Sequence, residues 1–292
     1  MPTTIALKRR IGSVRNTRQI TKAMELVSAS KMRRAQEQAK RSRDYREAAY
    51  SLLARLSSLQ ETDNHPLFQR RKVKSKLYIV ITSNSGLAGA YNYNVLKLLT
   101  KSVTADRDNG IKSYVITVGK QGANFVRRLE HVNLLAVYPA FGDEPSANDI
   151  RPILNTMLSE YRDKQIDEAD LIYTLFQSNL VQQATQLNIL PAHPDPADKE
   201  NQTYKYEFTN FEPSVDVVLD NVATRLLEVQ IWQGLLESLA SEHSMRMIAM
   251  KNATDNANDL IDDLTLEFNT VRQANITQEL AEITGGAEAI QR

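Results

Sequence analysis

A stretch near the C-terminus decides the fold: Met247-Ile-Ala-Met-Lys-Asn-Ala-Thr-Asp-Asn-Ala-Asn-Asp-Leu-Ile-Asp-Asp-Leu-Thr-Leu-Glu-Phe-Asn-Thr-Val271. One set of residues recurs at steps of alternately three and four: Met247, Met250, Thr254, Ala257, Ile261, Leu264, Phe268 and Val271. This is the heptad spacing of a helix that pairs along its length with a second helix. The pattern therefore predicts an extended coiled coil, whose other helix must lie elsewhere in the chain.

The prolines indicate where that second helix lies. Apart from Pro2, all of them fall between Pro66 and Pro213, so residues 3–65 and 214–292 contain no strong helix breaker. Both stretches are rich in residues with high helix propensity. A helix over 214–284 would be roughly 105 Å long, too long to fit inside a compact domain of this size. We expect three parts: an N-terminal coiled-coil helix (1–65), an α/β domain (66–213) and a C-terminal coiled-coil helix (214–292). The apolar stripe expected on the first helix is Leu7, Ile11, Val14, Ile20, Met24 and Val27.

The middle of the chain has a different pattern. Runs rich in β-branched and aromatic residues predict strands at 77–82, 113–118, 132–138 and 171–176, and helical patterns lie at 93–103, 120–129 and 147–162. Strands that alternate with helices predict a mostly parallel, Rossmann-like sheet. Two further β-like runs, 187–190 and 203–208, bracket a polar, proline-rich segment. That segment is expected to be a hairpin or a surface loop between edge strands.

The net charge of the 292 residues is only +1, but the charges are segregated. Residues 1–46 hold 13 basic and 3 acidic residues, whereas residues 212–292 hold 5 basic and 14 acidic ones. The two helices could simply complement each other, yet 13 cations on one helix cannot all face one partner. Outward cations fit phosphates or an acidic protein surface. Because Tyr45 is the only aromatic residue before Tyr50, stacking on nucleic acid is disfavoured and an acidic protein is favoured.

Tests for catalytic and cofactor sites are negative. The absence of cysteine excludes disulfides, thiolate metal sites and a cysteine nucleophile. The loop Thr82-Ser-Asn-Ser-Gly-Leu-Ala-Gly89 follows a strand, but it lacks the glycine spacing of a dinucleotide loop and the Lys-Ser/Thr of a P-loop. Its glycines are better explained by a tight turn and close packing. The four histidines are scattered, and His243 is expected to be buried and neutral. We expect no catalytic, cofactor or metal site.

Three segments resemble the gamma subunit of rotary ATP synthases. They are residues 11–36 (Ile-Gly-Ser-Val-Arg-Asn-Thr-Arg-Gln-Ile-Thr-Lys-Ala-Met and onward), residues 241–257 and residues 272–287 (Arg-Gln-Ala-Asn-Ile-Thr-Gln-Glu-Leu and onward). The similarity extends over the whole chain. It implies a non-catalytic rotor shaft, whose antiparallel coiled coil stands in a hexamer of alpha and beta subunits and whose α/β domain meets the epsilon subunit and the membrane c-ring. Rotation driven by proton flow would then change the beta-subunit nucleotide sites for ATP synthesis, or hydrolysis would drive the reverse.

The resemblance also implies site residues. Met24 with the cations Arg9, Lys22, Arg33 and Arg34 would meet acidic loops of the beta subunits, and Arg272, Gln273, Thr277 and Glu279 would contact beta-subunit loops near the other end. Phe211 and Glu212 would lie at the foot near epsilon and the c-ring, and residues 285–290 would lie in an apolar sleeve. Packing within the coiled coil or solvated charge is the alternative explanation for each of them.

Composition and resemblance together predict a bacterial peripheral membrane protein on the cytoplasmic face of the inner membrane. No run is apolar enough to span a bilayer, and no transit peptide or regulatory cysteine insertion is evident. Asn84 and Ser85 stand where the family usually has Asp-Arg, and Ala88 and Ala90 replace the commoner Cys and Gly. Two rival functions are a free-standing basic coiled-coil adaptor for nucleic acid and a nucleotide-dependent enzyme that uses the middle domain. Neither is expected.

Overall fold

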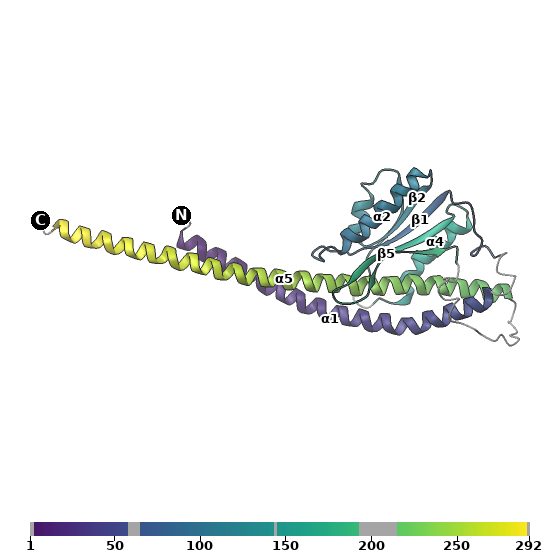
Figure 1. Ribbon diagram of the computed structural model, residues 1–292, viewed down its shortest axis with the longest axis horizontal. Coiled ribbons are helices and arrows are strands. Elements are labelled where there is room, and N and C mark those ends of the chain that lie inside the picture. The colour runs from purple at the N-terminus through teal and green to yellow at the C-terminus, as the bar shows by residue number, and fades with distance from the viewer. Residues whose placement is uncertain (1–2, 58–64, 143–144, 193–214, 291–292) are drawn as a thin grey trace. The chain divides into compact units, whose positions relative to one another are not determined.

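The computed structural model describes residues 3–57, 65–142, 145–192 and 215–290 (Figure 1). The chain forms two compact units: Met1–Ser28 with Arg246–Arg292, and Ala29–Met245. Two helices contribute to both units, α1 (Thr4–Ser57) and the 76-residue α5 (Val215–Ile290). The prediction of two very long terminal helices with an α/β domain between them is confirmed. The expected strand at 203–208 and the expected foot residues Phe211 and Glu212 lie outside the described residues.

In the first unit, the beginning of α1 pairs with the last part of α5. Leu7 and Ile11 of α1 form an apolar cluster with Leu264, against which Val14, Phe268 and Val271 pack. Further along, Arg18 donates a hydrogen bond to Asn258, and Thr21 contacts Thr254. Because the α5 number falls as the α1 number rises, the two helices are antiparallel, as predicted.

The heptad prediction holds for α5 and fails in part for α1. Met250, Thr254, Ala257, Ile261 and Leu264 are all buried. On α1, however, Ile20 and Val27 are 61% and 53% exposed, so their prediction as seam residues is wrong. Thr21 and Ser28 are buried instead, one position further along in each case. The seam continues from Leu7 and Ile11 in steps of three and four, and in this register it passes through polar residues.

The second unit contains a five-stranded sheet in the order β3-β2-β1-β4-β5 (Figure 1). Its strands are β1 (Ser75–Ile81), β2 (Lys112–Val118), β3 (Val132–Tyr138), β4 (Glu168–Phe176) and β5 (Gln182–Leu190). The first four are mutually parallel and β5 is antiparallel to β4. The prediction of a mostly parallel sheet is therefore confirmed, and the run at 187–190 is the end of a longer edge strand.

Helices cover both faces of this sheet. On one face, α2 (Tyr91–Asp108) and α3 (Lys120–Val126) pack over Tyr78, Val80 and Ile172. On the other face, α4 (Arg151–Arg162) and the first part of α5 enclose the larger core with Leu77, Ile79 and Leu171. Successive strand residues point to opposite faces, which is why odd and even positions of β1 belong to different clusters.

The expected helix at 147–162 consists of two parts. Residues Ala147–Ile150 form a 3₁₀ turn, η2, and α4 follows from Arg151. Ser146 and Asp149 form a reciprocal capping box, in which the Ser146 amide donates to the Asp149 carboxylate at 2.8 Å. Pro152 lies in the first turn of α4, where its missing amide hydrogen has no acceptor to lose.

Candidate interaction site on the paired helices

The paired ends of α1 and α5 form a rod whose seam changes character along its length. At one end the seam is apolar, with Leu7 fully buried and Leu264 4% exposed. Further along, the Oγ1 atoms of Thr21 and Thr254 lie 2.8 Å apart in a buried contact. Each hydroxyl also donates to its own helix backbone, Thr21 to Arg18 O at 3.0 Å and Thr254 to Met250 O at 2.8 Å. Since each hydroxyl has one hydrogen, at most two of these three contacts are hydrogen bonds at any one time, and the seam at this level is a small polar contact.

Cations line the outside of α1 in this unit, and acidic residues line α5. Lys8, Arg9, Arg10 and Arg15 are exposed on α1. Lys22 is also exposed and forms an ion pair of 3.0 Å with Glu25 of the same helix. On α5, the exposed acidic side chains of the described residues in this unit are Asp255, Asp259, Asp262, Asp263, Glu267, Glu279 and Glu282. The rod therefore presents opposite charges on its two helices.

The residues implied by the resemblance fall into separate groups. Arg9, Lys22 and the half-buried Met24 lie in the first unit, whereas the exposed Arg33 and Arg34 belong to the second. Arg272, Gln273, Thr277 and Glu279 are all exposed on α5. Thr277 donates to Gln273 O at 2.9 Å, a bond within the helix that leaves both side chains accessible. All the described members of the predicted set are thus exposed, except for Met24, which is half-buried.

Exposed apolar side chains on the rod were not predicted. On α1 these are Ile5, Ile20, Leu26 and Val27, and on α5 they are Leu260, Leu266, Ile276, Leu280 and Ile283, with exposed fractions from 42% to 74%. Large apolar residues gathered on a surface mark sites of protein contact. Ile276, Leu280 and Ile283 are spaced by four and three, which places them on one face of α5. For these three residues of α5 the signal in the sequence was their position outside the heptad seam, whereas the sequence predicts Ile20 and Val27 inside it.

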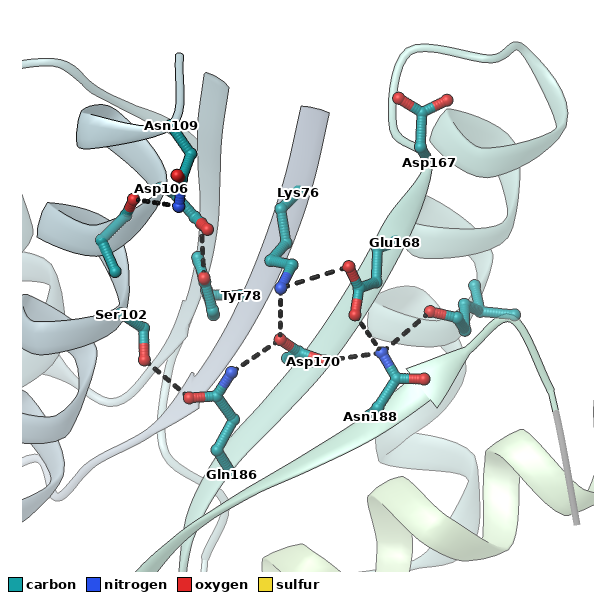
Figure 2. A network of polar contacts seen from close by, with 12 residues as sticks. Lys76, Tyr78, Ser102, Asp106, Asn109, Asp167, Glu168, Asp170, Gln186 and Asn188 are labelled. Atoms are coloured by element: carbon teal, nitrogen blue, oxygen red, sulfur yellow. Dashed lines mark hydrogen bonds and ion pairs between the residues drawn. The ribbon is translucent and has the colours of Figure 1, made fainter. Parts of the chain in front are cut away.

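A polar network lies in the second unit, on the α2 face of the sheet (Figure 2). Lys76 of β1 forms ion pairs with Glu168 at 3.2 Å and Asp170 at 3.5 Å, both on β4. Asn188 of β5 donates to Glu168 at 2.7 Å and to Asp170 at 2.9 Å, and Gln186 donates to Asp170 at 2.7 Å. Sequence reasoning missed this network, although each strand shows its signal: polar residues two apart on an inward face.

The electrostatics of this network argue for a structural role. Burial alone would lower the pKa of Lys76, but the carboxylates of Asp170 and Glu168 outweigh it and raise that pKa above its ordinary value. Lys76 is therefore a charged ammonium, and not a neutral nucleophile. Burial and the 2.5 Å hydrogen bond to Asp106 raise the pKa of Tyr78 far above its ordinary value, so the phenol stays neutral.

Cavities of about 440, 490 and 240 Å³ in this unit are lined by other residues. The network joins β1, β4, β5 and α2 and opens onto none of these cavities.

The loop after β1 is joined to neighbouring loops by the side chain of Asn84 and by close packing at Gly119. Asn84 accepts hydrogen bonds from the amides of Lys120 and Ala140 and donates to Ala140 O, so it joins the loops that follow β1, β2 and β3. Gly119 has φ +96°, and a Cβ atom there would lie 2.2 Å from Thr82 O. Gly119 is thus a close-packing residue, and the amides of Lys120 and Ala140 are engaged with Asn84.

Three further observations concern the described residues alone. Within them, no cluster of histidine and carboxylate side chains has the arrangement of a metal site. None of the helices in the described part combines the length and the apolar character that crossing a membrane requires. His243 is 9% exposed, in agreement with the expected burial.

A two-helix rod continuous with an α/β domain, exposing cations and apolar side chains along the rod, defines a class of subunits that act through contacts with other proteins. Comparison with known proteins identifies the family. The ATP synthase family model matches residues 3–290. The ATP synthase gamma chain of Pelotomaculum thermopropionicum is 41% identical over 291 residues, with 100% of both chains covered. The chain belongs to the ATP synthase gamma chain family, and the predicted resemblance is confirmed.

Solved structures agree on the fold. A chain of the Euglena gracilis mitochondrial ATP synthase in rotational state 3 superposes with a TM-score of 0.68 at 17% identity, covering 98% of this chain and 94% of that one. A chain of the Tetrahymena thermophila central stalk and c-ring gives a TM-score of 0.63 at 22% identity, covering 80% of this chain and 99% of that one. The combination of paired long helices and mixed sheet is thus shared by chains of mitochondrial ATP synthases from two organisms.

Proposed function

We propose that this protein is the central shaft of an ATP synthase. The paired ends of α1 and α5 would turn inside a hexamer of alpha and beta subunits, and the α/β domain would contact the epsilon subunit and the c-ring. The shaft itself would catalyse nothing. It would couple proton flow through the c-ring to ATP synthesis or hydrolysis at the beta-subunit sites, as a peripheral protein on the cytoplasmic face of the bacterial inner membrane. Family membership supports this proposal over a nucleic-acid adaptor.

The observation that carries the proposal is that the two paired helices expose charges of opposite sign. α1 exposes cations such as Arg9 and Arg15, and α5 exposes carboxylates such as Asp259 and Asp263. A single rod of this kind cannot present the same surface to three beta subunits at once. Three chemically identical sites would therefore be held in different states, because each contacts a different side of the shaft. Rotation of the rod would pass each site through those states in turn.

We also propose a division of labour along the chain. The coiled-coil parts 1–65 and 214–292 would supply the shaft, and residues 66–213 would supply the domain that receives torque. Arg9, Lys22, Met24, Arg33 and Arg34 would meet the beta subunits on one part of the shaft, and Arg272, Gln273, Thr277 and Glu279 on another. The exposed stripe of Ile276, Leu280 and Ile283 supports an apolar enclosure for the end of α5. Phe211 and Glu212 would form part of the foot.

Deletion and co-purification test the central proposal. The tagged native protein should co-purify with alpha and beta subunits, and its deletion should abolish ATPase activity of the assembled complex on membranes. Purification without those subunits, together with membrane ATPase activity that survives the deletion, would contradict the shaft function.

A substitution tests the role of Met24. Met24→Lys adds a cation where the beta subunits are expected to contact the rod, so it should impair coupling more than assembly. The exposed neighbour Ala23 offers a matched control, since Ala23→Lys adds the same charge one position away. Protons pumped per ATP hydrolysed should fall in Met24→Lys and fall less in Ala23→Lys. A normal pumping ratio in assembled Met24→Lys enzyme would refute the assignment.

A further inference from the structure

Three serines of α5 are buried against the sheet in the second unit. Ser238, Ser241 and Ser244 are each 0% exposed and are spaced by three residues along the helix. The backbone amide of Thr174 donates to Ser238 Oγ at 3.0 Å, and Ser241 Oγ donates to the carbonyl oxygen of the same Thr174 at 3.3 Å. Ser244 Oγ donates to Asn179 O at 3.0 Å. The helix is thus bonded directly to the backbone of β4 and of the turn that follows it.

These bonds form at a special place in the sheet. The pairing of β1 with β4 ends at Val80 and Ile172, so Thr174 lies two residues beyond it. The strand order reverses between β1 and β4, and open α/β sheets bind their ligands at the carboxyl ends of the strands at such a point. In this chain, Ser238 and Ser241 bind the backbone groups of Thr174 there. A helix of the same chain takes the position that a ligand takes in other proteins with this topology.

The packing below the serines brings α5 unusually close to the sheet. A Cβ atom on Gly234 would lie 2.6 Å from Leu171 Cδ2 and 3.5 Å from Tyr173 Cγ. Around it, Leu226, Leu227, Ile231 and Leu235 of α5 belong to the same core as Leu171. Interdigitated apolar side chains oppose movement of α5 on the sheet, and hydrogen bonds in addition depend on angle. The serines therefore add an angle-dependent constraint to this packing.

We propose that Ser238, Ser241 and Ser244 lock α5 against rotation on the α/β sheet and so carry torque between that domain and the shaft. The proposal rests on the proposed shaft function and names the residues of the domain through which force passes. Backbone connections whose φ and ψ angles are free to rotate carry little torque. Side-chain contacts between α5 and the domain must carry it instead. The serines act as positioning residues and touch no substrate.

The test uses the complete ATP synthase in inverted membrane vesicles. Ser241→Thr and Ser241→Val add the same volume to the same buried position and differ in the hydroxyl group, so their difference reports the hydrogen bond. The number of protons pumped per ATP hydrolysed should fall in Ser241→Val and should be retained in Ser241→Thr. The double variant Ser238→Ala with Ser241→Ala should lose coupling further and should widen the angular fluctuations of the rotor in single-molecule recordings.

Leu226→Ala serves as the structural control. Leu226 is 0% exposed in the same helix–sheet core, so this variant weakens the packing and leaves the serine bonds in place. It should lower the thermal stability and preserve the pumping ratio of assembled enzyme. Equal pumping by Ser241→Val and Ser241→Thr would overturn the proposal, as would a loss of coupling in Leu226→Ala as large as in the serine double variant. Failure of the shaft function is a separate outcome, seen as coupled activity that persists when the whole chain is deleted.

Discussion

Replacing Leu264 with alanine should loosen the paired ends of the two long helices, and the same change at Leu266 should not. The two leucines lie two residues apart on α5. Leu264 is 4% exposed and contacts the cluster of Leu7 and Ile11, whereas Leu266 is 71% exposed. The pair therefore separates the effect of burial from the effects of residue type and of helix propensity.

The magnitude follows from burial. Leu264→Ala removes three buried carbon groups, each contributing about 0.8 kcal/mol of transfer free energy. A cavity adds to this cost in a rigid core, but a two-helix rod can close partly around the smaller side chain, so we expect the lower part of the usual range, about 2–3 kcal/mol. Leu266 remains largely in water in both the folded and the unfolded state, so its loss should change the free energy of unfolding by no more than about 0.5 kcal/mol.

Hydrogen exchange of the full-length chain measures both effects locally. Amides of residues 7–21 and 254–268 should exchange faster in Leu264→Ala and at the native rate in Leu266→Ala. Association with alpha and beta subunits should show the opposite pattern. Leu266→Ala should weaken it more than Leu264→Ala, because an exposed leucine is free to contact a partner. Equal protection of the two variants in hydrogen exchange would refute the seam described here.

Two further predictions concern the α/β domain. Tyr78→Phe leaves the buried Asp106 without its closest donor and should lower the free energy of unfolding by about 1–3 kcal/mol at neutral pH. Because the folded pKa of Tyr78 lies above its unfolded value near 10, its contribution is complete below that pH and is lost as the pH rises further. Denaturant titrations should therefore show a shallower alkaline decline in Tyr78→Phe, and an unchanged slope would contradict this. Gly119→Ala should cost at least about 3 kcal/mol, because the new Cβ meets Thr82 O at a positive φ. Gly110→Ala, at φ +71° with nothing within 4 Å of the added Cβ, should lower the free energy of unfolding clearly less in the same denaturant titrations.

The sequence predicts the periodic parts of this structure and misses the parts that depend on pairing. The α5 seam could be predicted because Met250, Ile261 and Leu264 follow a heptad without interruption. The α1 seam could not, because Thr21 and Ser28 occupy seam positions and resemble surface residues. Only the position of α1 against α5 shows which residues of α1 face inward, and that position is a property of two helices together.

The site residues show the same division. The cations of α1 could be expected to face outward, since their number exceeds what one helix seam accommodates. The Lys76 network could not be assembled from the sequence, because its members come from β1, β4 and β5, and their register is set by strand pairing. Polar residues at alternate strand positions were the available signal. Without the strand order, they are equally consistent with a solvated face.

The inverted positions on α1 are explained by the proposed contacts of the rod with partner subunits. Burying Thr21 and exposing Ile20 runs against what would stabilise two helices in water. An apolar residue at position 21 and a polar residue at position 20 would place a large apolar side chain in the seam and a polar one outside. By burial alone, this exchange would stabilise the isolated pair of helices. Departures of this kind from a consistent pattern are expected at functional sites. At residues 20–28 the seam therefore buries less apolar surface. Apolar side chains are exposed on the rod instead, where contact with a partner subunit can bury them.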